Sequence, residues 1–383
     1  MPATSSDSFA RTTRSTRSAK RQRLAVAALT LPLLALSACG YGSKSEDKGS
    51  DASPVAQGKA IDGLGEVKIG YFANVTHGTA LVGLGQGGLI QKELGGTKVK
   101  SQVFNAGPAE IEALNSGAID IGWIGPSPSI NGYTKSQGKS LRIISGSASG
   151  GVSLVVNPKK IKSLDDLEGK TIATPQLGNT QDVALLNYLA EKGYKVDATS
   201  GKGDVNIART DNKVTPIAFK NGDIDGAWVP EPTASKLVAD GGKVLLDERK
   251  LWKDGKFVIT NIIVRQEFLE KYPKVVEAVL RGSVNTNAWI NENPDEAKQA
   301  INDVLKEETG KALPAEVIDP AFENVDFLDD PLAATLRDEA QHAVKAGLLK
   351  DPLLDGIYDL RPLNKVLSAA GKPSVDDAGL GAK

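Results

Sequence analysis

Histidine and cysteine are nearly absent from this sequence. Its 383 residues include two histidines, His77 and His342, and one cysteine, Cys39. This set cannot supply a histidine-rich metal site, a thiolate cluster or an intrachain disulfide. Two histidines also leave few possibilities for a Ser-His-Asp triad. We expect a protein that is not an enzyme and uses no metal or cofactor.

An excess of charge of either sign is also missing. Lysine and arginine together number 46, and aspartate and glutamate 47, for a formal net charge of −1. A nucleic-acid partner would need a strongly basic face, and nothing in this balance suggests one, so we expect no nucleic-acid partner. Hydrophobic residues make up 40% of the chain, and a chain of this length commonly divides its core between two lobes or domains.

The start of the chain has the pattern of an export signal. Residues 11–23 are basic and carry no acid, and an apolar run follows from Leu24 to Leu36. This run is shorter than the roughly 20 residues that cross a bilayer. It ends in Leu36-Ser37-Ala38-Cys39-Gly40, which resembles the lipobox of bacterial lipoproteins, where the cysteine is acylated and becomes the first residue. We therefore expect a signal peptide over residues 1–38, the alternative being a plain secretory signal with an incidental cysteine.

Residues 39–65 have the composition of a flexible linker. They are rich in glycine, serine, alanine, lysine and aspartate, and bury too little apolar surface to fold. With lipid on Cys39, this linker would hold a folded body at the outer face of the cytoplasmic membrane.

Short apolar runs alternate with helical patterns from Val67 onward, which indicates an α/β fold of parallel sheets with crossover helices. Strands are expected at Val67–Tyr71, Val99–Phe104, Ile119–Ile124, Leu141–Ser145, Val152–Val156, Thr171–Ala173, Val205–Ala208, Gly226–Val229, Lys243–Leu246 and Val258–Val264. Helices are expected near Ala80–Leu94, from Pro108, at Thr180–Lys192, at Pro216–Asn221 and through most of the remainder.

The chain is expected to form two lobes with a cleft between them. One lobe would comprise residues 66–152 and 260–383, and the other residues 153–259. Crossings near Val152–Val156 and Val258–Val264 would then form a hinge.

A short internal similarity supports two related lobes. The segment Asn115-Ser116-Gly117-Ala118-Ile119-Asp120 is echoed by Asn221-Gly222-Asp223-Ile224-Asp225. In each copy a glycine can end a helix in the left-handed conformation before the chain enters a strand. Chance similarity is the alternative. If the copies are related, the loop after each strand lies where open α/β sheets bind ligands.

Three loops combine glycine with hydroxyl or amide side chains: residues 74–79, 125–129 and 178–181. Each can present backbone N–H groups at a helix start, which suits a small oxyanion held by neutral donors. An ordinary N-cap is the alternative for each loop. Glu231, between two prolines, can receive a cationic group of the ligand or be a solvated carboxylate at a helix start. Trp123 and Trp228 suit either the core or a ligand wall.

The stretch from Val67 to roughly Ala300 resembles the substrate-binding proteins of the nitrate, sulfonate and taurine ABC importers. The segments that carry the resemblance are Ala106-Gly107-Pro108, Ala113-Leu114-Asn115-Ser116-Gly117-Ala118-Ile119-Asp120-Ile121-Gly122, Gly125-Pro126-Ser127-Pro128, Ser163-Leu164-Asp165-Asp166-Leu167-Glu168-Gly169-Lys170, Gly222-Asp223-Ile224-Asp225-Gly226-Ala227-Trp228 and Phe268-Leu269-Glu270-Lys271-Tyr272-Pro273.

The resemblance implies a monomer with a periplasmic-binding-protein fold, which closes on a small anion and delivers it to an importer permease. It also implies that the cleft is lined by Asn74, His77, Gly78, Thr79, Gly125, Pro126, Ser127, Asn179, Thr180, Gln181, Trp228 and Glu231. Relatives often carry an aromatic residue where this chain has Pro230, which leaves the substrate open.

An aliphatic sulfonate or taurine is the ligand we expect, with an ammonium group of taurine pairing with Glu231. A nitrate-type anion, or a pyrimidine precursor of thiamin held by Trp228 and Glu231, are the alternatives. Enzymatic motifs are incomplete: Gly83, Gly85 and Gly88 match G-x-G-x-x-G too far from the first strand, and the segment around Ser127 lacks the closing glycine of a nucleophile elbow.

Overall fold

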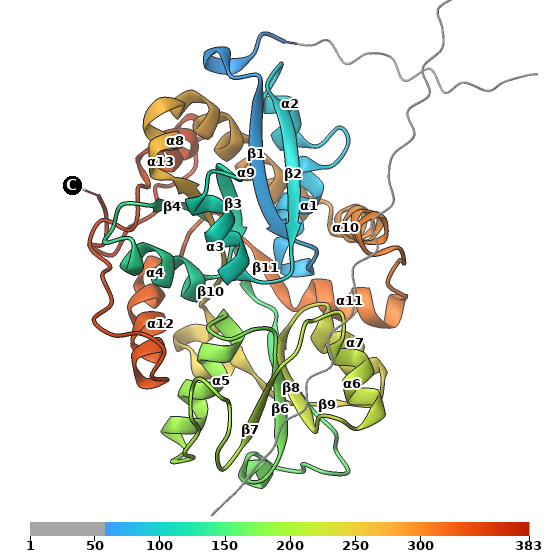
Figure 1. The fold of residues 1–383 in the computed structure, drawn as a ribbon. Coiled ribbons are helices and arrows are strands. Elements are labelled where there is room, and N and C mark those ends of the chain that lie inside the picture. Colours follow the sequence, from blue (N-terminus) through green and yellow to red (C-terminus); the bar gives the residue numbers. More distant parts are fainter. Residues whose placement is uncertain (1–57, 383) are drawn as a thin grey trace, which may run out of the picture. The chain divides into compact units, whose positions relative to one another are not determined.

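The computed structural model describes residues 58–382 (Figure 1). The expected signal peptide, Cys39 and the linker up to residue 57 lie outside the described residues. The fold is mixed α/β with two sheets, as predicted. None of the helices in the described part of the chain is both long and apolar enough to span a membrane.

The first sheet has the strand order β2-β1-β3-β10-β4-β11. The strands β1 and β2, and likewise β1 and β3, run parallel, whereas β10 is antiparallel to both β3 and β4. Its strands are β1 (Glu66–Phe72), β2 (Lys98–Phe104), β3 (Ile121–Ile124), β4 (Leu141–Gly150), β10 (Val258–Arg265) and β11 (Val325–Phe327).

The second sheet has the order β7-β6-β8-β5-β9. Here β6 pairs in parallel with β7 and β8, and β5 is antiparallel to β8 and β9. Its strands are β5 (Val152–Val156), β6 (Thr171–Thr174), β7 (Asn206–Arg209), β8 (Gly226–Pro230) and β9 (Lys243–Asp247). Both sheets thus contain three neighbouring parallel strands next to an antiparallel strand, and in each sheet that antiparallel strand directly follows a crossing between the sheets.

Helices connect the strands and form most of the C-terminal part of the chain. They are α1 (Gly78–Leu84), α2 (Leu89–Glu93), α3 (Gly107–Asn115), α4 (Pro126–Lys135), α5 (Thr180–Glu191), α6 (Thr215–Asn221), α7 (Thr233–Ala239), α8 (Gln266–Lys271), α9 (Pro273–Glu292), α10 (Pro294–Thr309), α11 (Ala315–Glu323), α12 (Ala333–Lys345) and α13 (Arg361–Ala369). The 3-10 helices are η1 (Ile61–Gly63), η2 (Val75–His77), η3 (Leu164–Leu167), η4 (Glu248–Leu251) and η5 (Lys253–Gly255).

The chain passes between the sheets at two places. The first is the pair Gly150 and Gly151, whose φ angles of 75° and 67° favour glycine. The second is the segment of η4 and η5 that precedes β10. The expected crossing segments, Val152–Val156 and Val258–Val264, each belong wholly to one sheet, so the crossings lie just before them.

The internal similarity has the same structural role in both sheets. Gly117 and Gly222 follow α3 and α6 with φ angles of 72° and 81°. The Asp120 carboxylate then accepts the backbone N–H of Lys68 at 3.1 Å, and the Asp225 carboxylate that of Thr171 at 2.9 Å. Each aspartate therefore binds the start of the central parallel strand of its sheet. The loops after β3 and β8, which follow the two aspartates, lie at equivalent carboxyl ends of the two sheets.

One helix expected at Ala80–Leu94 is broken into α1 and α2. The break falls at residues 85–88, where Gly87 has a φ of 74°. An added Cβ at Gly88 would lie 2.3 Å from the Gly83 carbonyl oxygen, so the chain turns back on itself there. The short strand β11 is a second difference, since three residues at a sheet edge carry too little pattern to be predicted.

Candidate ligand-binding site

A small polar pocket lies where loops from both sheets meet. We call it the inner pocket, and it is lined by Phe72, Asn74, Thr76, His77, Asn105, Gly125, Asn179, Thr180, Gln181, Asn212, Pro230 and Ile259. Six of the predicted cleft residues are in this set: Asn74, His77, Gly125, Asn179, Thr180 and Gln181.

Strand ends bring these six residues together. Asn74 follows β1 and precedes η2, Gly125 lies between β3 and α4, and Asn179 precedes α5 in the loop after β6. The three strands are members of the parallel groups, so the loops emerge at carboxyl ends, where open α/β sheets bind ligands.

No charged side chain is present among the described residues that line the inner pocket. His77 is neutral, because burial lowers its pKa to about 3. Its Nε2–H donates to the Trp123 carbonyl oxygen at 3.1 Å, which leaves Nδ1 to accept the Thr76 hydroxyl at 3.1 Å. An anion in this pocket would therefore be held by neutral groups.

Thr180 provides the clearest unused donor. Its side chain is buried, and its Oγ1 has no hydrogen-bond partner among the described residues. Thr180 is also the first residue of α5, and the N–H groups of the first two residues of a helix have no acceptor within it. The helix dipole favours negative charge at this end. Hydroxyl, amides and dipole together suit a small oxyanion.

Contacts across the pocket join the two sheets' loops. The Asn179 Oδ1 accepts the N–H of Gly107 at 3.4 Å, and its Nδ2 donates to Gln181 Oε1 at 3.0 Å. An added Cβ at Gly125 would lie 2.3 Å from Thr180 Oγ1. The loops after β3 and β6 are thus in close contact.

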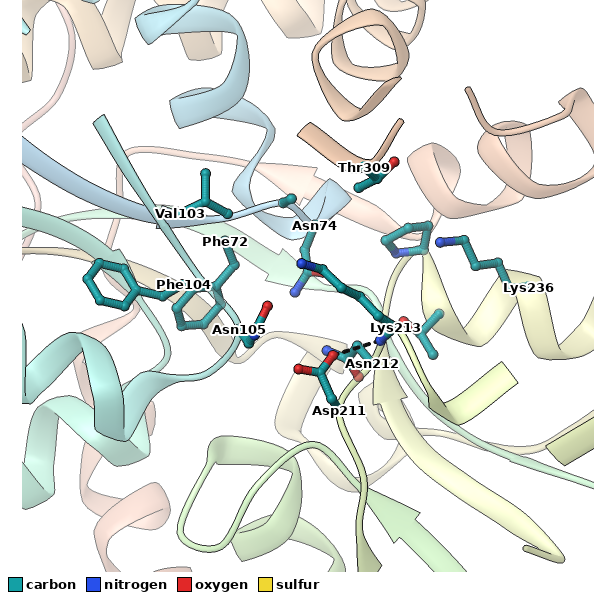
Figure 2. A pocket seen from close by; sticks show the side chains of 13 residues that line it. Phe72, Asn74, Val103, Phe104, Asn105, Asp211, Asn212, Lys213, Lys236 and Thr309 are labelled. Atoms are coloured by element: carbon teal, nitrogen blue, oxygen red, sulfur yellow. Dashed lines mark hydrogen bonds between the residues drawn. The ribbon is translucent and has the colours of Figure 1, made fainter. Parts of the chain in front are cut away.

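A second polar pocket adjoins the first, and we call it the outer pocket (Figure 2). Phe72, Asn74, Asn105 and Asn212 line both pockets. The outer pocket is further lined by Ala73, Val103, Phe104, Asp211, Lys213, Pro232, Thr233, Lys236 and Thr309. In contrast to the inner pocket, it contains two lysines and one aspartate.

Four predicted cleft residues lie near the site but line neither pocket. A Cβ at Gly78 would lie 2.7 Å from Ile301 and Phe327, so glycine at this position allows these two side chains to pack against the backbone. The Thr79 hydroxyl donates to Asn287 in the core. Pro126 is buried in the first turn of α4, and the Ser127 hydroxyl lies 3.5 Å from Glu339.

Trp228 and Glu231 have partners within the protein instead of facing either pocket. The Trp228 Nε1–H donates to Glu248 Oε2 at 2.6 Å in the core. The Glu231 carboxylate accepts the Ser235 N–H at 3.0 Å and the Asn324 side-chain N–H at 2.8 Å, and Glu231 is only 2% exposed. An ammonium-binding role for Glu231 has no support in this arrangement.

Sequence reasoning missed half of the inner pocket: Phe72, Thr76, Asn105, Asn212, Pro230 and Ile259. Phe72 ends β1, and Asn105 directly follows β2. The strand-end rule that selected Asn74 could have selected these two residues. Ile259 lies inside β10, and nothing in its sequence context distinguishes it from a core residue.

The described residues contain no group of three histidine, cysteine, aspartate or glutamate side chains that could hold a metal ion.

The sequence model of the NMT1-like family matches residues 63–305 of this chain. The chain belongs to the NMT1-like family. The match covers every strand of both sheets except β11, and all loops of the inner pocket.

One similar protein and two similar solved structures are binding proteins by name. The taurine-binding periplasmic protein of Escherichia coli is 32% identical over 204 residues, which are 53% of this chain and 61% of that protein. The nitrate-binding protein of Synechocystis has a TM-score of 0.68 at 17% identity, covering 82% of this chain and 91% of that one. The alkanesulfonate-binding protein of Xanthomonas axonopodis bound to MOPS has a TM-score of 0.61 at 22% identity, covering 75% and 95%. These structures show that the fold is that of the periplasmic binding proteins.

Proposed function

We propose that this chain is the extracytoplasmic substrate-binding lipoprotein of an ABC importer and that it captures a small oxyanion, with an aliphatic sulfonate as the first choice. The observation that carries the proposal is the inner pocket itself, whose lining is uncharged and includes the unpartnered Thr180 hydroxyl at the start of α5. The relatives' names, which include taurine, alkanesulfonate and nitrate, support the same ligand class.

Neutral donors suit this class for a physical reason. A sulfonate or nitrate spreads one negative charge over three oxygens, so several ordinary hydrogen bonds can replace its water. A buried cation is not needed, and the positive end of α5 adds favourable electrostatics. A pyrimidine precursor, by contrast, would want a carboxylate for its amine, and the inner pocket offers none among its described lining residues.

Replacing Thr180 tests the assignment. Thr180→Val keeps the shape of the side chain and removes the hydroxyl, whereas Thr180→Ser keeps the hydroxyl. Calorimetric titration with an alkanesulfonate should show about ten- to a hundredfold weaker binding for Thr180→Val, because a hydrogen bond to a charged group is worth about 1.5–3 kcal/mol. Thr180→Ser should stay within a few-fold of the wild type.

Nitrate is the second arm of the same titration. If neither sulfonates nor nitrate bind the wild-type protein, the small-oxyanion assignment is wrong. If nitrate alone binds, the importer class stands and the sulfonate choice is wrong. A thermal shift gives an independent reading, since free ligand at 100 times its dissociation constant adds about 2.7 kcal/mol to the free energy of unfolding.

Anchoring is tested separately, because Cys39 lies outside the described residues. We expect Cys39→Ala to move the exported protein from the membrane fraction to the soluble fraction, since acylation at the cysteine would be lost. Mass spectrometry of both forms checks the lipid directly. A wild type that is already soluble, or a variant that still carries lipid, would contradict the anchor.

A further inference from the structure

The outer pocket extends the binding site away from the uncharged end. Because it shares Phe72, Asn74, Asn105 and Asn212 with the inner pocket, a ligand held in the inner pocket would have its tail in the outer one. In Figure 2 the side chains of Lys213 and Lys236 both extend toward the middle of the lining residues. The tail would therefore meet two ammonium groups.

Lys236 is the more constrained of these two lysines. It projects from α7 and lines both the outer pocket and a wider surface hollow next to it. Burial lowers the pKa of Lys236, and no carboxylate among the described residues opposes that shift. A partly desolvated ammonium without a counter-charge is unfavourable, and an anionic group at that place would compensate it.

Three of the nearby carboxylates, those of Asp211, Glu308 and Asp240, have contacts with other residues. Asp211 Oδ1 accepts the backbone N–H of Lys213 at 2.8 Å, and Glu308 Oε1 accepts the Tyr71 hydroxyl at 3.1 Å. Asp240, in the surface hollow, lies 3.9 Å from Lys220 Nζ. The lining of the outer pocket thus has two positive groups and one negative group, and the inner pocket has none.

We propose that the ligand carries two anionic ends: an oxyanion in the inner pocket and a carboxylate at the end of a short chain, paired with Lys236 and assisted by Lys213. This inference rests on the proposed function and narrows its substrate class from alkanesulfonates to carboxyalkanesulfonates. It also replaces the expectation of an ammonium-bearing tail, because the tail pocket presents cations.

Three ligands of one length test the charge of the tail. Propane-1-sulfonate, taurine and 3-sulfopropanoate share a sulfonate and two methylenes and end in methyl, ammonium and carboxylate. Calorimetric titration of the wild type should give the highest affinity for 3-sulfopropanoate, by roughly ten- to a hundredfold over propane-1-sulfonate. Taurine should bind less well than propane-1-sulfonate. 4-Sulfobutanoate is added to find the preferred chain length.

Variants of Lys236 test whether this residue recognises the carboxylate of the ligand. Lys236→Met keeps the length of the side chain without its charge and should abolish the preference for a carboxylate, so that 3-sulfopropanoate and propane-1-sulfonate bind within about twofold of each other. A cooperative thermal melt shows that the variant is folded. Lys236→Arg should keep the preference, and so should Lys202→Met, whose lysine is exposed and lines neither pocket.

Each other outcome overturns the inference. A wild type that binds propane-1-sulfonate but prefers taurine, or has no preference, rejects the two-ended ligand and leaves the proposed function standing. Equal weakening of all three ligands by Lys236→Met assigns the lysine to long-range attraction of anions only. A wild type that binds none of the four sulfonates rejects the sulfonate choice together with the inference.

Discussion

Gly125→Ala is expected to weaken ligand binding by about five- to 150-fold without unfolding the protein. Gly125 has a φ of −71° and a ψ of 160°, which alanine adopts without strain. The added Cβ would, however, lie 2.3 Å from Thr180 Oγ1 and 3.4 Å from Thr180 Cβ. Overpacking of this kind costs about 1–3 kcal/mol. Because the two residues belong to loops of different sheets, we expect the cost to fall on a closed arrangement in which two lobes would meet around the ligand.

Small-angle scattering and calorimetry together check this expectation. With saturating ligand the radius of gyration of the wild type should decrease, whereas the Gly125→Ala variant should keep its larger radius and a normal melting temperature. Gly65→Ala is the matched control, since no atom lies within 4 Å of a Cβ at Gly65. A Gly125→Ala variant that binds as tightly as the wild type would refute the closing contact.

A second substitution separates the collision from other causes. Thr180→Ala removes the Oγ1 that the new Cβ would strike, so the double variant should regain a ligand-induced decrease in radius. Its affinity should equal that of Thr180→Ala alone, because the lost hydroxyl is not replaced. Additive losses in the double variant would show that Gly125 acts independently of Thr180.

The strands and the loops that follow them could be predicted because their signals are local. Apolar runs fix the strands, and the glycines at Gly117 and Gly222 mark where helices end before a strand. The strand-end rule then selects Asn74, Gly125 and the loop before α5 as site residues. All of these inferences use neighbours in the sequence only.

The roles of Glu231 and Trp228 could not be predicted, because their partners are distant in the sequence. Glu231 accepts a hydrogen bond from Asn324, 93 residues further on, and Trp228 donates to Glu248. A carboxylate between two prolines looks free until that long-range contact is known. Lys236 is a similar case, since its place in the outer pocket depends on how α7 packs beside the loops after β2 and β7.

Glu110 is a buried acid that the binding site does not use. It lies in α3, and both of its carboxylate oxygens lack a hydrogen-bond partner among the described residues. The side chain fits over Gly70 and Gly122, which are paired in register on β1 and β3. Added Cβ atoms there would lie 2.7 Å and 2.3 Å from Glu110 Oε1. Burial raises the pKa of Glu110 well above its usual value, so the folded protein favours the protonated carboxyl.

The free energy of unfolding should therefore depend on pH through Glu110. In the unfolded chain the carboxyl ionises above its ordinary pKa of 4.5, while the folded protein keeps the proton to a higher pH. The free energy of unfolding is therefore not reduced by Glu110 below pH 4.5. It decreases as the pH rises from 4.5 toward the pKa that Glu110 has in the folded protein. The loss amounts to about 1.4 kcal/mol per pH unit.

Two substitutions of Glu110 separate two contributions to the free energy of unfolding: the ionisation of the carboxyl and the burial of polar atoms without a hydrogen-bond partner. Glu110→Gln cannot ionise, so between pH 5 and 8 its stability should fall less steeply than that of the wild type, by up to about 1.4 kcal/mol per pH unit. Glu110→Met, similar in length and flexible, should show the same change in slope and in addition be more stable than Glu110→Gln by about 1–3 kcal/mol, because no buried polar atom is left without a partner. Denaturant unfolding at several pH values measures both quantities. If wild type and Glu110→Gln have parallel pH profiles, Glu110 ionises equally in both states and is not protonated in the fold.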